Sequence, residues 1–104
     1  MSKRLEVLRK MIDANTGDLA FARYALAMEL KSLGQLDEAL QAFEELRAFD
    51  PSYVAQYLMA GGVADQLGKK DEARAWFQRG VEAARKKGDA HALSEIQGAL
   101  DALG

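Results

Sequence analysis

The sequence contains no cysteine, and this absence excludes several kinds of site. Without cysteine there is no disulfide, no thiolate nucleophile and no thiolate ligand for a metal. His91 is the single histidine, so the convergent ligands of a zinc site are lacking as well. We therefore expect no metal and no other cofactor, and a fold that does not depend on redox conditions.

The chain also lacks an excess of charge of one sign and a long apolar run. It holds 14 Lys and Arg residues against 16 Asp and Glu residues, for a formal net charge of -2 at pH 7. This balance provides no basic field for nucleic acid or for anionic lipid. No segment approaches the roughly 18 apolar residues of a membrane span, and the first residues lack the apolar core of a signal peptide. The sequence predicts a cytoplasmic protein with no nucleic-acid partner and no membrane association.

Signatures of catalysis are missing too. No Gly-rich phosphate loop, activated nucleophile or pair of carboxylates at catalytic spacing stands out in the sequence. General acid and base chemistry needs a buried cleft with perturbed groups, whereas the carboxylates here fall mostly on solvated helix faces. We expect a protein that is not an enzyme.

What the chain does have is helical periodicity, interrupted by glycine and by one proline. Asp18 is expected to cap the second helix, and Gly34 to end it in a left-handed conformation. Pro51 suits the first turn of the fourth helix. Short connections make successive helices antiparallel. The predicted helices span 3–14, 19–33, 37–49, 52–67, 70–86 and 89–103.

Part of the sequence occurs twice. Residues 33–43 return as residues 67–77, displaced by 34 residues, with Leu-Gly, Asp-Glu-Ala and Phe in the same places. A period of this length is typical of stacked units that bury their apolar faces against their neighbours. Such arrays present an extended surface to partners, so the repeat favours a binding function over a catalytic one.

The period and the residues at fixed offsets within it resemble the tetratricopeptide repeat (TPR). In that family small and apolar residues of a first helix pack against a small residue and an aromatic residue of the second, and a proline closes the unit. The matching residues of the first copy are Leu26, Ala27, Leu30, Gly34, Ala39, Phe43 and Pro51. Those of the second copy are Tyr57, Ala60, Gly61, Ala64, Gly68, Ala73 and Phe77. The sequence departs from the pattern at Arg23, where a large apolar residue is common, and at Arg85, where the proline would fall.

The resemblance implies an all-α fold, a right-handed stack of antiparallel helical hairpins (a TPR-like α-solenoid) with about six helices. It predicts a single domain over residues 1–104. An N-terminal capping helix would lie in 1–17, the repeats would span 20–53 and 54–87, and a C-terminal capping helix would lie in 88–104.

The resemblance also implies a partner-binding groove lined by the first helices of the two repeats. Its aromatic and methionine side chains would form an adaptable apolar surface, suited to an amphipathic segment of a partner. One subclass of the family holds a C-terminal carboxylate through Lys and Asn residues; Tyr24, Met28 and Met59 occupy those places here. The predicted partner-binding residues are Phe21, Tyr24, Met28, Lys31, Ala55, Leu58, Met59, Gly62 and Asp65.

We therefore predict a non-catalytic protein-protein interaction module, an adaptor or scaffold, that binds a protein or peptide partner in this groove. Two alternatives stay open: the groove serves self-association in a homodimer, or its side chains pack internally. Tyr24→Ala or Met59→Ala is expected to weaken partner binding and to leave folding nearly intact.

Two further positions depend on packing. Trp76 has Ala42 as its counterpart in the first copy; internal packing is favoured, and an exposed Trp76 would indicate a second interaction surface. Gly61 and Gly62 are both expected at positions of close helix packing.

Overall fold

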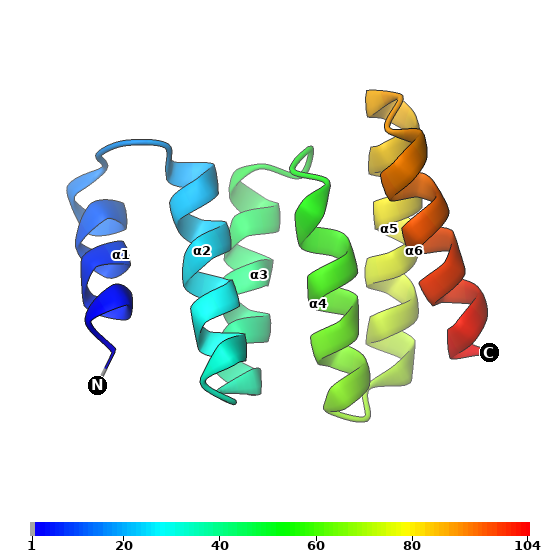
Figure 1. Ribbon diagram of the computed structural model, residues 1–104, viewed down its shortest axis with the longest axis horizontal. Helices are drawn as coiled ribbons and strands as arrows, with labels where there is room; N and C mark the ends of the chain where they lie inside the picture. The colour runs from blue at the N-terminus through cyan, green and yellow to red at the C-terminus, as the bar shows by residue number, and fades with distance from the viewer. Residues whose placement is uncertain (1) are drawn as a thin grey trace. The chain divides into compact units, whose positions relative to one another are not determined.

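The computed structural model describes residues 2–104, and these residues form six α-helices and no strand (Figure 1). The all-α prediction is confirmed, and five of the six helices begin and end within one residue of their predicted bounds. The helices are α1 Lys3–Ala14, α2 Leu19–Ser32, α3 Leu36–Phe49, α4 Ala55–Gln66, α5 Lys70–Lys87 and α6 Ala90–Leu103.

α4 is the exception, because it begins three residues later than predicted. Pro51 and Ser52 form a turn, so the placement of Pro51 in the first turn of a helix is wrong. The Tyr57 hydroxyl donates a hydrogen bond to the carbonyl oxygen of Pro51. A helix starting at Ser52 would need that same oxygen for its first backbone bond. The side chain of Tyr57 thus stabilises a turn where proline alone had indicated a helix.

Local signals define the ends of α2. The Asp18 carboxylate accepts a hydrogen bond from the backbone N–H of Phe21 at 3.0 Å, the expected N-cap bond. After the helix, Gly34 adopts a φ of 78°, a left-handed conformation that costs glycine little. Gly68 follows α4 with the same φ. The Leu-Gly pair common to both sequence copies therefore marks the turn between the helices of each pair.

The chain divides into two compact units, and unit 1, which ends at Asp50, contains α1, α2 and α3. α2 packs against both of the other helices, and its buried residues fall on two faces for that reason. Alanines at the helix contacts let the backbones approach closely, while leucine and phenylalanine fill the core. The fully buried residues of this unit include Ala22, Ala27, Leu30, Ala39, Phe43 and Leu46.

Unit 2, Pro51–Gly104, contains α4, α5 and α6, and α6 packs against both of the others. Gly61 lets α5 approach α4, because a Cβ there would overlap the ring of Phe77. Gly80 has a similar role: a Cβ there would lie 2.6 Å from Cβ of Tyr57. At Gly62 a Cβ would meet nothing within 4 Å, so the expectation of close packing is confirmed for Gly61 and wrong for Gly62.

Trp76 belongs to the core of unit 2. Its side chain is 2% exposed, and its ring centroid lies 6.0 Å from that of Tyr57. The predicted internal packing is confirmed, and Trp76 provides no second interaction surface. The guanidinium of Arg79 lies 5.8 Å from the centroid of the Trp76 ring and covers it on the outer side of α5.

Candidate functional site

The four predicted site residues of α2 lie on one face of that helix. Phe21, Tyr24, Met28 and Lys31 are spaced by three or four residues, which places their side chains in one row. Phe21 is 53% exposed, and the other three are half-buried. This α2 row combines an aromatic end, a flexible thioether and a cation near the helix C-terminus, where the helix dipole favours a positive charge.

Tyr24 is less available than its place in the α2 row suggests. Its ring meets that of Phe43 edge to face, with centroids 6.3 Å apart. Burial raises the pKa of the Tyr24 hydroxyl above its ordinary value. Because Tyr24 closes part of the unit 1 core, Tyr24→Ala removes packing as well as surface, and it is a poor test of partner binding alone.

The predicted site residues of α4 also share one helix face. Ala55 and Asp65 are exposed at the ends of this α4 row, and Leu58, Met59 and Gly62 are half-buried between them. A Cβ at Gly62 would meet nothing within 4 Å, so this face is open at that position. The structure thus gathers four predicted residues on α2 in unit 1 and five on α4 in unit 2. That the two rows form one groove stays a prediction.

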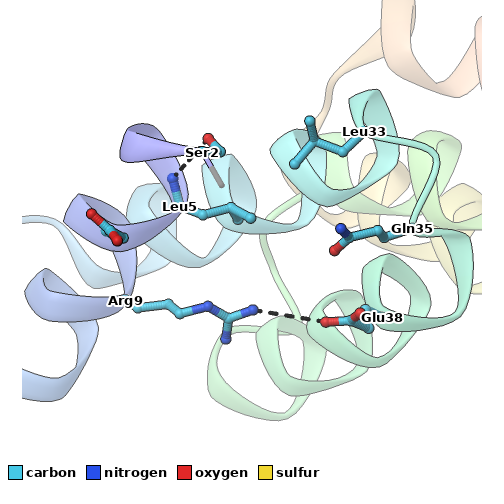
Figure 2. Close-up of a pocket in the computed structure, with 7 residues that line it drawn as sticks. Ser2, Leu5, Arg9, Leu33, Gln35 and Glu38 are labelled. Atoms are coloured by element: carbon cyan, nitrogen blue, oxygen red, sulfur yellow. Dashed lines mark hydrogen bonds and ion pairs between the residues drawn. The ribbon is translucent and has the colours of Figure 1, made fainter.

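Unit 1 contains a cavity that the sequence did not indicate. It has a volume of about 610 Å³ and lies between the start of α1 and the turn from α2 to α3. Figure 2 shows Leu5 of α1 facing Leu33, and the Arg9–Glu38 ion pair, 3.9 Å between Nη2 and Oε2, linking α1 to α3. Its lining residues are Ser2, Leu5, Glu6, Arg9, Leu33, Gln35 and Glu38.

A second hollow of about 380 Å³ lies on the other flank of the contact between α1 and α2. We name it the α1–α2 crevice. Val7, 57% exposed, and Phe21 form its rim, and most of its lining is apolar. The apolar stripe that predicts the first helix consists of Leu5, Leu8, Met11 and Ile12. Val7 lies off this stripe, so periodicity gave no reason to single it out. The lining residues are Lys3, Arg4, Val7, Leu8, Met11, Phe21 and Ala22.

The polar groups of the described chain do not converge on a chemical centre. Within residues 2–104 no group of three His, Cys, Asp or Glu side chains could hold a metal ion. His91 pairs with Glu95 at 3.3 Å on the exposed side of α6. Over the same residues, no helix has both the length and the apolar character required to cross a membrane.

Comparison with known proteins identifies the family to which this helical architecture belongs. Residues 30–95 match the sequence model of the tetratricopeptide repeat. The chain belongs to the tetratricopeptide repeat family. A TPR domain protein from Salinibacter ruber, known from a solution structure, is 38% identical to it; the match covers 81% of this chain and 85% of that one, with a TM-score of 0.77. The resemblance carried by the 34-residue period is therefore confirmed.

Other solved structures share the TPR fold. A protein from Bordetella parapertussis is 27% identical, with 99% of this chain and 89% of that chain covered and a TM-score of 0.82. PcrH from Pseudomonas aeruginosa is 20% identical, with 95% and 75% covered and a TM-score of 0.86. No curated protein was found to match the sequence.

Proposed function

We propose that this TPR protein is a non-catalytic interaction module that binds a segment of a partner protein on the α2 and α4 rows. One observation carries the proposal. Met28, Leu58 and Met59 lie on these rows and are only half-buried, whereas the residues on the opposite faces of both helices are buried. Flexible thioether and aliphatic side chains suit the apolar face of an amphipathic segment.

The fold offers a precedent for such binding. The structure of PcrH has been determined in complex with the chaperone binding region of PopD, and that chain shares the TPR fold at 20% identity. The precedent supports the general mode, in which a helical repeat holds a segment of another protein. It leaves the partner of the present protein open. The side chains of the α2 row differ from those of the α4 row, and these side chains are the ones that would select a partner.

The test uses a peptide selected for binding to the wild-type protein from a library of amphipathic helical peptides. Met28→Gln and Met59→Gln keep the length of the side chain, and glutamine is as good a helix former as methionine. Each substitution replaces an apolar contact with an amide. Each is expected to weaken binding about tenfold, which corresponds to the loss of one important contact. Leu33→Gln is the matched control, since Leu33 is 47% exposed and lies outside both rows.

Thermal unfolding of the three variants separates loss of binding from loss of fold. If neither methionine variant weakens binding while both remain folded, the two rows do not form the binding surface. Sedimentation equilibrium addresses the alternative of self-association. A wild-type dimer that dissociates in Met28→Gln or Met59→Gln would assign the rows to a homodimer interface and contradict the proposal.

A further inference from the structure

The α1–α2 crevice exposes apolar side chains that nothing in unit 1 covers. Val7 and Phe21, on its rim, are two of the four large apolar residues that remain exposed in the described chain. Leu8 and Ala22 are buried at its base, and Met11 is half-buried beside them. Exposed single residues are ordinary on a protein surface, but residues from two helices gathered over one hollow are typical of an interaction site.

The packing of α1 explains why the hollow is open. α1 packs against α2, whereas α6, the terminal helix of unit 2, packs against two helices. Leu8 is the one residue of α1 that is buried. A helix with a single neighbour keeps one flank of its apolar side uncovered, and in α1 that flank is the row of Val7 and Met11.

The charges around the crevice indicate what could cover it. α1 carries four cations and two carboxylates, although the whole chain has a net charge of -2. Lys3 and Lys10 stand four residues before and three residues after Val7, so they flank it on the same helix face, and both are exposed. Arg4 lines the crevice and pairs with Glu29 of α2, with Nε and Oε1 3.6 Å apart.

We propose that the α1–α2 crevice is a docking site for an acidic amphipathic helix of a partner protein. Leucine-like side chains of that helix would enter the hollow between Val7 and Phe21, and its carboxylates would meet Lys3 and Lys10. A second copy of this chain fits less well, since two α1 helices brought face to face would oppose their cations. The proposal goes beyond the function proposed above, because the crevice shares only Phe21 with the α2 and α4 rows.

The test measures binding of a synthetic peptide of about 18 residues, long enough to form a helix, with leucines at helical spacing and glutamates on the other face. A counterpart carries lysine in place of every glutamate. The 104-residue chain is titrated, and binding is followed by fluorescence anisotropy of the labelled peptides. Val7→Glu should weaken binding of the acidic peptide by about tenfold or more, through loss of an apolar contact and gain of repulsion. Leu33→Glu, which makes the same change of charge at a similar exposure outside the crevice, should leave binding within about twofold of wild type.

A second pair of measurements tests the charge complementarity. Reversal of both lysines in Lys3→Glu/Lys10→Glu should weaken the acidic peptide and reduce the dependence of its affinity on salt. Circular dichroism verifies the fold of each variant; Val7, Lys3 and Lys10 are exposed, so helix content should be unchanged.

Several results would overturn the proposal. These are no binding of the acidic peptide at about 1 mM, equal binding of the lysine counterpart, or equal effects of Val7→Glu and Leu33→Glu. Sedimentation of the wild type as a dimer that Val7→Glu dissociates would assign the crevice to a second copy. Binding to anionic lipid vesicles that Val7→Glu abolishes, without binding to the peptide, would assign it to a membrane surface. Because Met28→Gln and Met59→Gln lie outside the crevice, they should leave binding of this peptide unchanged, which separates this proposal from the previous one.

Discussion

Gly61 and Gly62 are neighbours in α4, yet their surroundings are opposite. A Cβ at Gly61 would overlap the buried ring of Phe77, whereas one at Gly62 would meet nothing within 4 Å. Gly61→Ala should therefore lower the free energy of unfolding by about 1–3 kcal/mol, because Phe77 has little room to move. Gly62→Ala should raise it by about 0.5–1 kcal/mol, since alanine restricts the unfolded chain and favours the helix. Urea denaturation of the two variants measures both changes, and effects of the same sign would contradict this account of α4 packing.

Tyr24 links the stability of the fold to alkaline pH. Burial raises its pKa above the ordinary value of 10.0, so the folded protein favours the neutral phenol. The stability that this provides is fully present below pH 10 and is lost as the pH rises through the folded-state pKa. In Tyr24→Phe this titration is gone. The free energy of unfolding of the variant should therefore rise relative to that of wild type as the pH is raised beyond 10, in urea titrations that start near neutral pH. A difference between the two proteins that stays constant over that range would show that Tyr24 is equally solvated in the folded and unfolded chain.

At the scale of residues, helical spacing predicts which side chains of α2 share one face, but it could not rank the exposure of the side chains within that face. Phe21 and Tyr24 are both aromatic and lie in the same row, yet only Tyr24 meets Phe43. That contact joins two helices, so no spacing within α2 reveals it. Val7 escaped notice for a related reason, since an apolar residue off the main stripe has no meaning until the neighbouring helix is in place.

Among the elements, α3 differs from α2 in how it begins. Asp18 caps α2 through its side chain, whereas Gln35, at the N-cap of α3, makes no side-chain cap bond. Gln35→Ser would place a hydroxyl where it can accept a hydrogen bond from the backbone N–H of Glu38, the third residue of α3; the backbone N–H of residue 35 itself is already bonded to the carbonyl oxygen of Leu30. The variant should gain about 1 kcal/mol of stability, because serine accepts a hydrogen bond from an otherwise unbonded backbone N–H.

Asp18→Ala, which removes the cap of α2, should lose a similar amount of stability. Thermal unfolding of both provides the comparison, and a neutral Gln35→Ser would mean that the start of α3 is already satisfied by water.

Helix bounds were predictable because their causes are local. Glycine after α2, and a capping aspartate before it, act through residues a few positions away. The start of α4 was mispredicted because its cause lies six residues after Pro51, in the first turn of α4, where the Tyr57 hydroxyl donates a hydrogen bond to the Pro51 carbonyl oxygen. Contacts between helices, such as that of Gly61 with Phe77, were predictable only through the repeat, which supplied the register that a single helix lacks.

For the molecule as a whole, the distribution of buried residues predicts uneven stability along the chain. α1 has one buried residue and packs against one helix, whereas α5 has six and packs against α4 and α6. Local opening requires the loss of few contacts in α1 and of many in α5. Amide hydrogen exchange should therefore be fastest in α1 and slowest in α5, and equal protection of the two helices would contradict this picture.

The same measurement connects stability with the proposed docking site. A helix bound in the α1–α2 crevice would give α1 a second neighbour and cover Val7, so α1 would open less often. Addition of the acidic peptide should slow exchange in α1 and in the first turns of α2, and leave α5 and α6 unchanged. The Val7→Glu protein, treated in the same way, should show no slowing. Protection that appeared instead along the whole of α2 and in α4 would place the peptide on the α2 and α4 rows, and α1 would then be a cap with no partner of its own.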